Sequence, residues 1–168
     1  MTVDNEREQL IAFLAEERDL FRITLRGLTE EQARQRSTVS ELTLGGLLHH
    51  INNCERHWTT ILVERDENAE IDLAAMDSEY KMGADETVAG LLAEWEATAE
   101  HTAKVIRELP TLDDTVPQPI APWTPEPVRL PVRWVLLHIL REISQHAGHA
   151  DIIREAVDGA NSTYSRMP

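Results

Sequence analysis

Residues 137–149 read Leu-His-Ile-Leu-Arg-Glu-Ile-Ser-Gln-His-Ala-Gly-His and carry the most informative helical pattern of the chain. Residues three and four apart are neighbours on a helix, so Glu142, His146 and His149 lie along one side of it. At about 3.6 residues per turn, the surrounding apolar stripe is centred within roughly 40° of His146. His146 therefore points into a core. A buried imidazole, and a carboxylate one turn before it, both need a partner.

The composition is that of an acidic chain. Its 168 residues carry 30 acidic and 16 basic side chains, which gives a net charge of −14. A chain of this length can bury about two thirds of its unfolded surface, so residues 1–168 are expected to form a single domain. The sequence holds no long basic patch, which argues against nucleic acid and anionic membrane as partners.

Three further features favour the cytoplasm. The amino terminus lacks the basic segment and apolar core of a signal peptide. No apolar run approaches the roughly 20 residues of a membrane span. The single cysteine, Cys54, excludes an internal disulfide and suits a reducing compartment. We therefore expect a cytoplasmic protein and interpret Cys54 as a small buried apolar residue.

Helical periodicity predicts four long helices, and no convincing period-two alternation competes with it. These helices span about residues 4–27, 44–64, 87–109 and 132–158. Thr43 is the expected N-cap of the second helix, and Gly159 the expected stop of the fourth. Residues 29–32, Thr-Glu-Glu-Gln, resemble a capping box that opens a short extra helix.

Residues 110–131 hold seven prolines, which no regular helix tolerates. We expect a long Pro-rich crossover between the third and fourth long helices, and hence an all-α four-helix bundle of non-simple topology. Long segments without regular structure are often functional, so this one, with Trp123, is a candidate wall of a site. Residues 66–85 are polar and are expected to form a loop with at most a helical turn.

Helical phase separates the histidines of the second long helix. With Leu47 at 0° and about 100° per residue, the apolar stripe centres near about 30°, His50 near about −60° and His49 near about 200°. His49 should therefore face solvent, while His50 can reach across to a neighbouring helix. His57 points in nearly the same direction as His50 but lies more than about 10 Å along the axis, too far to share an ion.

His50, Glu142 and His146 together form a candidate set of metal ligands. Two imidazoles and one carboxylate leave coordination positions open, as catalytic zinc requires, and the same set suits Fe(II) or Ni(II). His149 is either a fourth ligand or, as we favour, a group outside the coordination shell. A buried polar pair with ordinary hydrogen bonds would show the same spacing, so the residues alone leave that alternative open.

Two segments resemble the DinB-like superfamily. The first reads Leu-Thr-Leu-Gly-Gly-Leu-Leu-His-His-Ile (42–51) and continues to Glu-Arg-His-Trp (55–58). The second begins Arg-Trp-Val-Leu-Leu-His-Ile (133–139) and contains His-Ala-Gly-His-Ala-Asp-Ile-Ile-Arg-Glu (146–155), its most specific part. The resemblance covers nearly the whole chain. It is closest to the mini-circle-protein branch, which is related to mycothiol-dependent maleylpyruvate isomerase and the thiol S-transferases.

The resemblance implies a four-helix bundle with one divalent metal, held by a histidine of the second helix and two ligands one turn apart on the last. These positions match His50, Glu142 and His146. Many relatives have histidine at the position of Glu142, whereas the mycothiol-dependent isomerase branch has glutamate. The resemblance therefore implies thiol chemistry for this chain.

The expected activity is that of a divalent-metal-dependent transferase that conjugates a low-molecular-weight thiol, mycothiol or an analogue, to an electrophile. Zinc is the first expectation for the metal, with nickel or iron as alternatives. His149 is the expected catalytic group, which orients a ligand or transfers a proton. Rival hypotheses are a thiol-dependent isomerase of the maleylpyruvate type, a non-catalytic metal-binding stress protein and a purely structural histidine cluster. A homodimer formed through an exposed helix face is a further expectation.

Overall fold

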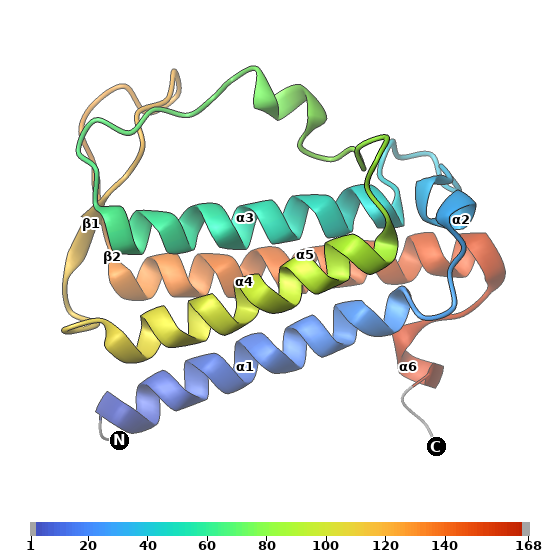
Figure 1. Ribbon diagram of the computed structural model, residues 1–168, viewed down its shortest axis with the longest axis horizontal. Helices are drawn as coiled ribbons and strands as arrows, with labels where there is room; N and C mark the ends of the chain where they lie inside the picture. The colour runs from blue at the N-terminus through green and yellow to red at the C-terminus, as the bar shows by residue number, and fades with distance from the viewer. Residues whose placement is uncertain (1–2, 166–168) are drawn as a thin grey trace.

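Four long helices pack side by side along their lengths (Figure 1). They are α1 (Val3–Thr24), α3 (Leu44–Glu64), α4 (Val88–Glu108) and α5 (Val132–Asp158), with short helices α2 (Glu30–Arg34) and α6 (Ser162–Ser165). The computed structural model describes residues 3–165, apart from the side chains of residues 3, 4, 75, 77 and 165. The prediction of an all-α four-helix bundle is confirmed.

Threonine side chains begin several of these helices. The Thr43 hydroxyl accepts a hydrogen bond from Gly46 N at 3.1 Å, and the Thr87 hydroxyl accepts one from Gly90 N at 3.0 Å. Each bond satisfies an amide that has no partner within its helix. Thr29 and Gln32 form the predicted capping box of α2. The helix α5 ends at Gly159, whose φ of 81° is the left-handed conformation that glycine adopts without strain.

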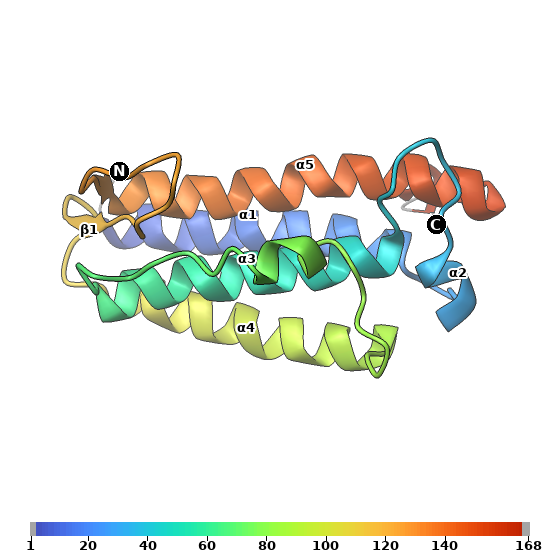
Figure 2. The same ribbon diagram turned by 90° about the horizontal axis from the view of Figure 1, so that it is seen from above.

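The direction of the helices determines the path of the chain. In Figures 1 and 2, α1 and α5 run one way, whereas α3 and α4 both run the other way. Because α3 and α4 are parallel neighbours, their connection must return along the length of the bundle. Residues 65–87, which we call the crossover segment, make this return over α3 and include the 3-10 helix η1 (Ala75–Ser78).

The Pro-rich segment stays at one end of the bundle, so the predicted Pro-rich crossover is not confirmed. It forms the strands β1 (Thr115–Pro117) and β2 (Arg129–Pro131), which pair antiparallel with Val116 opposite Leu130. Prolines exclude a helix, but they do not determine where an extended segment goes. Each strand has only three residues, too few for an alternating pattern to be recognised.

A charged pair lies inside the core, between α1, α3 and α4. Arg18 Nη2 donates to Glu55 Oε1 at 2.6 Å, and Trp95 Nε1 donates to Glu55 Oε2 at 2.9 Å. The side chains of Arg18 and Glu55 are only 5% and 1% exposed. Leaving either charge unpaired would be costly. The pair therefore favours one rotation of α3 about its axis, with the face that carries His50 turned toward α5.

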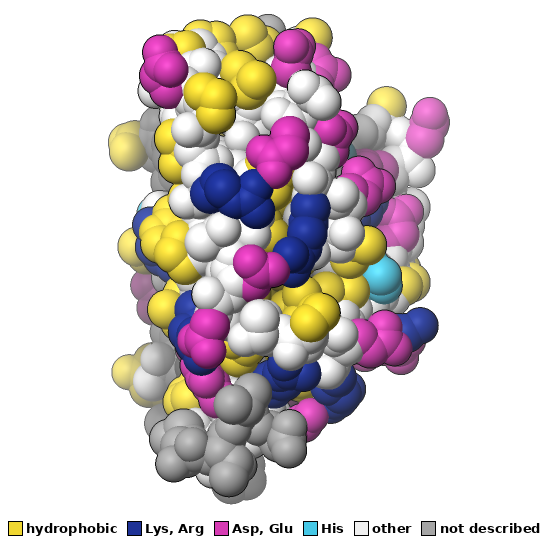
Figure 3. Space-filling model, turned by 90° about the vertical axis from the view of Figure 1, so that its left-hand side faces the viewer, with side chains coloured by type: hydrophobic (Ala, Val, Ile, Leu, Met, Phe, Trp, Pro, Cys, Tyr) yellow, Lys and Arg dark blue, Asp and Glu magenta, His cyan; other side chains and the backbone are white. Residues whose placement is uncertain are grey.

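The end of the bundle near the β1–β2 hairpin carries mixed charges. Figure 3 shows acidic and basic side chains interspersed with apolar ones on this face, without a continuous basic area among the described residues. Of the helices that the structure describes, none is long and apolar enough to cross a membrane.

Candidate metal centre

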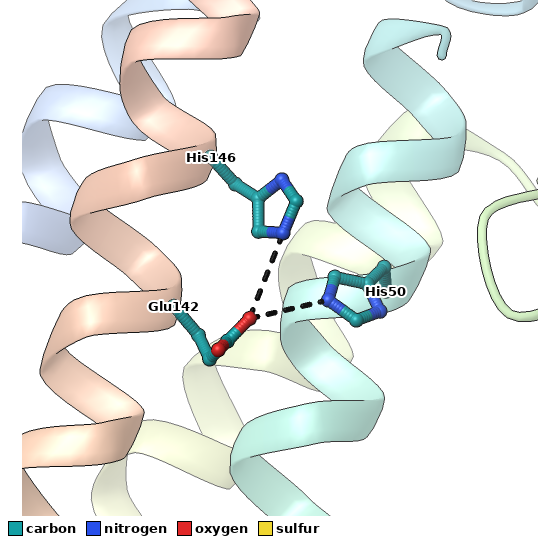
Figure 4. Close-up of side chains that lie close together, drawn as sticks. All are labelled: His50, Glu142 and His146. Carbon is teal, nitrogen blue, oxygen red and sulfur yellow. Dashed lines mark ion pairs between the residues drawn. The ribbon is translucent and has the colours of Figure 1, made fainter. Parts of the chain in front are cut away.

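Three side chains from α3 and α5 converge between the two helices (Figure 4). His50 Nε2 lies 3.8 Å from Glu142 Oε2, and His146 Nε2 lies 3.6 Å from the same oxygen. One donor atom from each residue lies within 4.8 Å of the other two. His50 and His146 are 7% and 4% exposed. Among the side chains that the structure describes, this is the one group of at least three histidines, cysteines or carboxylates with such spacing.

The spacing of these atoms fits a divalent cation. Ligands about 2.1 Å from a tetrahedral zinc are about 3.4 Å apart, close to the two separations from Glu142 Oε2. His50 Nε2 is buried and has no hydrogen-bond partner among the described residues. An imidazole nitrogen left without a partner in the interior is costly. A cation held jointly with Glu142 and His146 would provide the missing partner.

The crossover segment supplies a carboxylate to the other nitrogen of His50. His50 Nδ1 lies 3.1 Å from Glu79 Oε1, and this hydrogen bond holds the pKa of Glu79 below its usual value. A carboxylate can only accept, so Nδ1 carries the proton and donates it. Nε2 of the neutral ring then presents a lone pair toward Glu142 and His146. This tautomer is the one that binds a cation through Nε2.

His146 is prepared in a similar way by its neighbour on α5. Its Nδ1 lies 3.2 Å from Nδ1 of His149, one turn further along the helix. Burial first, and then the imidazoles of His50 and His149, lower the pKa of His146 to about 4. His146 is therefore neutral near pH 7, as a metal ligand must be. His149 is half-buried and contacts the group from outside through His146.

Tyr80 of the crossover segment covers the group. Its ring stacks on His50 with centroids 4.1 Å apart and planes inclined by 24°, and its centroid lies 5.8 Å from that of His146. Burial, and next the negative charge of Glu142, raise the pKa of Tyr80. Its hydroxyl therefore remains protonated at neutral pH and can donate a hydrogen bond.

Aromatic rings line the side of the group toward the hairpin. His138 stacks on Trp134 with centroids 5.0 Å apart and meets Trp58 edge-on at 4.7 Å. His138 Nδ1 is 3.7 Å from Glu142 Oε1, and Arg141 Nη2 is 3.3 Å from the same oxygen. Burial lowers the pKa of His138. The second oxygen of Glu142 thus faces an aromatic wall formed by Trp58, Trp134 and His138.

Two histidines of α3 lie outside the group. The expectation that His49 faces solvent was wrong: its Nδ1 lies 2.9 Å from both oxygens of Glu86, and Asn53 Nδ2 lies 2.7 Å from its Nε2. The phase argument considered only the helices of the bundle, whereas the crossover segment covers this side of α3. His57 is exposed and lines a separate pocket of about 170 Å³ with Pro117 and Pro119.

Cys54 lies on the turn of α3 after His50 and is half-buried. Burial first, and then the charges of Glu142 and Glu79, raise the pKa of its thiol to about 12. The thiol is therefore protonated at neutral pH, and a protonated thiol is a poor nucleophile.

The sequence did not indicate Glu79 or Tyr80. Both belong to a stretch without helical period, and the segment expected to line the site was the Pro-rich one. In the structure Trp123 of that segment lies in a turn with Ala121 and Thr124 and is 59% exposed. The only available signal was a chemical one: a buried imidazole such as His50 requires partners for both of its nitrogens.

The fold and the site together define a class: a four-helix bundle in which a histidine of one helix meets a glutamate and a histidine one turn apart on another. Comparison with known families makes the assignment more specific. The family model described as mycothiol-S-transferase matches residues 9–159, and the chain belongs to this family. No curated protein matches the chain.

Proposed function

We propose that the protein is a divalent-metal-dependent transferase that conjugates mycothiol, or a similar low-molecular-weight thiol, to an electrophile. One observation carries the proposal: the buried Nε2 of His50 has no hydrogen-bond partner in the part of the chain that the structure describes, and it faces Glu142 and His146. The match to the mycothiol S-transferase family directs this group toward thiol chemistry. The proposal makes a small-molecule thiol and an electrophile the partners of the site.

His50, Glu142 and His146 would hold the ion, for which zinc is our first assignment, with nickel or iron as alternatives. A bound divalent cation would supply the positive charge that favours the thiolate form of a nearby thiol. Glu79 maintains the tautomer of His50 that presents Nε2 to the group. These three ligands leave coordination positions open for a co-substrate.

The protein's own cysteine is not the nucleophile in this proposal. Burial and nearby carboxylates raise the pKa of Cys54 to about 12 in the metal-free protein, and a protonated thiol is a poor nucleophile, which favours a sulfur from a separate molecule. This property of Cys54 supports a low-molecular-weight thiol as co-substrate.

His149 is the catalytic group that we propose outside the ligand set. If His146 binds through Nε2, its Nδ1 carries a proton and donates it to Nδ1 of His149, 3.2 Å away. His149 thereby maintains the orientation of His146. An imidazole can both accept and donate a proton, so His149 also suits proton transfer during the reaction.

We propose the aromatic wall as the surface that receives the electrophile. Trp134 stacks on His138, is 41% exposed and lies on the same helix as Glu142, two turns before it. Flat apolar groups gain contact area on such rings. This arrangement places the electrophile beside the ligand set and away from the hydrogen bond between His146 and His149.

Metal analysis and a thiol-transfer assay on untagged protein test the proposal. Wild-type protein should contain about one divalent ion per chain and conjugate mycothiol to a chromogenic electrophile. His146→Ala should lose both properties, whereas the control His101→Ala, at an exposed position of α4, should keep both. Absence of stoichiometric metal from the wild type, or unchanged metal content and rate in His146→Ala, would contradict the proposal.

Product mass separates the proposal from its closest rival. A retained thioether indicates transfer, whereas a product of unchanged mass indicates a thiol-dependent isomerase. A metal-loaded protein that turns over no thiol and electrophile pair would instead be a metal-binding module.

A further inference from the structure

Two consecutive glycines at the start of α3 lie directly beneath the crossover segment. A Cβ atom added to Gly46 would lie 2.1 Å from the carbonyl oxygen of Tyr80, and one added to Gly45 would lie 2.5 Å from Met82 Sδ. The first contact is with backbone, which cannot rotate away as a side chain can. Both glycines are helical, so conformational freedom does not account for them. Their missing side chains let the crossover segment approach α3 closely.

The segment is held in this close position by further contacts. Arg34 of α2 donates to the carbonyl oxygens of Met82, Gly83 and Glu86 at 3.0, 2.8 and 2.7 Å. The Glu86 side chain accepts a hydrogen bond from Gly83 N at 2.6 Å and lies 2.9 Å from His49 Nδ1. Residues 79–86 are thus anchored on the first turns of α3 and on α2.

This docking lies one helical turn from a proposed metal ligand. Gly46 and His50 are four residues apart and share a face of α3. Tyr80, whose carbonyl lies over Gly46, stacks its ring on His50, and its neighbour Glu79 contacts His50 Nδ1 at 3.1 Å. The height of the crossover segment above Gly46 therefore determines whether Glu79 reaches His50.

We propose that Gly45 and Gly46 act as positioning residues that seat Glu79 on His50 and thereby set the affinity of the site for a divalent cation. This inference rests on the metal site of the proposed function. The carboxylate that orients a metal-bound imidazole is typically worth about 10- to 100-fold in affinity. A side chain at position 46 would lift the segment and remove that contribution without changing any ligand.

Cation binding alone tests this inference. Co²⁺ is titrated into metal-free protein, with affinity measured by competition with a chromogenic chelator and coordination followed by the visible absorption of the bound ion. Gly46→Ala and Glu79→Ala should each weaken binding by at least about tenfold. The double variant Gly46→Ala/Glu79→Ala should bind Co²⁺ no more weakly than the weaker of the two single variants, because both changes remove the same contact.

Two control variants are available: Gly90→Ala for the change at Gly46, and Arg36→Ala for a change at Arg34. Gly90 occupies the same position in α4 as Gly46 in α3: its amide is capped by a threonine, and an added Cβ would meet only that threonine hydroxyl, at 3.0 Å. Gly90→Ala should bind Co²⁺ as the wild type does. Arg34→Ala should weaken binding, whereas Arg36→Ala should not, because the partners of Arg36 lie in its own loop: the carbonyls of Val39 and Ser40 and the carboxylate of Glu41.

The results separate this inference from the proposed function. A folded Gly46→Ala protein, checked by circular dichroism, that binds Co²⁺ as tightly as wild type overturns the inference, as do additive losses in the double variant. If Gly46→Ala does not fold, Glu79→Ala and Arg34→Ala provide the test. Wild-type Co²⁺ affinity in both of these variants would overturn the inference. Weakened variants of a protein without thiol transfer support the inference and contradict the function. A wild type that binds no cation contradicts both.

Discussion

The Nδ1 atoms of His146 and His149 face each other across 3.2 Å on successive turns of α5. Only one of two facing nitrogens can carry the shared proton. A cation on Nε2 of His146 assigns that proton to His146 and makes His149 the acceptor. Cation binding to His146 therefore determines which tautomer His149 adopts.

Removal of His149 should weaken the site without abolishing it. In His149→Ala, Nδ1–H of His146 loses its acceptor, and cation affinity should fall by about tenfold or more. His149→Gln should lose less, because its amide oxygen can accept the same hydrogen bond. Competition titration with Zn²⁺ measures the effect, and unchanged affinity in His149→Ala would show that the contact does not support binding.

The stability of the metal-free protein should fall as the pH falls from about 6.5 to about 4. The pKa of His146 is lowered from 6.5 to about 4 in the folded state. Above this pH range the His146 ring is neutral in both the folded and the unfolded protein, so its protonation does not lower the stability. Within it the unfolded chain binds a proton that folded His146 resists, which costs up to about 1.4 kcal/mol per pH unit. The pKa values of His57 and His138 are also lowered, so these two residues add to the loss of stability as the pH falls.

Urea unfolding at pH 7, 6, 5 and 4 measures this dependence. His146→Gln removes the titrating group, so its free energy of unfolding should depend less on pH over the same interval. An equal pH dependence in wild type and variant would mean that His146 is not the group responsible.

Cys54 should resist alkylation in the folded, metal-free protein. Its thiol has a pKa of about 12, so almost none is present as the reactive thiolate at pH 7.5. Iodoacetamide labelling followed by mass spectrometry should be slow in buffer and rapid in urea. Cys54→Ala should retain thiol transfer within about twofold, since it removes no group that the reaction uses. Fast labelling of the folded protein would contradict the protonated state.

The buried Arg18–Glu55 pair should matter more to stability than any surface pair. Arg18→Met leaves the Glu55 carboxylate uncompensated in the core and should lower the free energy of unfolding by about 3–5 kcal/mol. A second change, Glu55→Gln, should recover part of this loss, because the amide is neutral and its oxygen still accepts from Trp95. Arg107→Ala breaks an exposed pair with Glu8 and should change stability little. Chemical denaturation of the four proteins provides the comparison.

Much of the bundle and of the candidate site could be predicted because the helical periodicity of the sequence indicates both the long helices and the residues that share a helix face. The spacing of Glu142 and His146 placed them on one face, and the phase of α3 selected His50 over His49. In the structure these three side chains meet. Thr43 and Gly159 marked helix ends by chemistry that acts within a few residues.

The remainder could not be predicted because it depends on direction and on distant contacts. Periodicity shows which residues share a helix face, but it does not show that α3 and α4 are parallel. The path of residues 65–87, and with it the positions of Glu79 and Tyr80, follows from that direction. The same omission explains His49: its phase was assigned correctly, but the segment that covers it was unknown.

The parallel arrangement of α3 and α4 leaves the chain with spare length. A helix of 21 residues rises about 30 Å, whereas 23 extended residues, the length of the crossover segment, reach about 75 Å. The surplus allows the segment to turn, carry η1 and settle on the two glycines. The proposed metal ligands lie on the long helices, whereas the residues that cover them belong to the crossover segment, which is longer than its path requires. A loop graft that kept residues 79–86 would therefore alter what enters the site while leaving its ligands and the bundle in place.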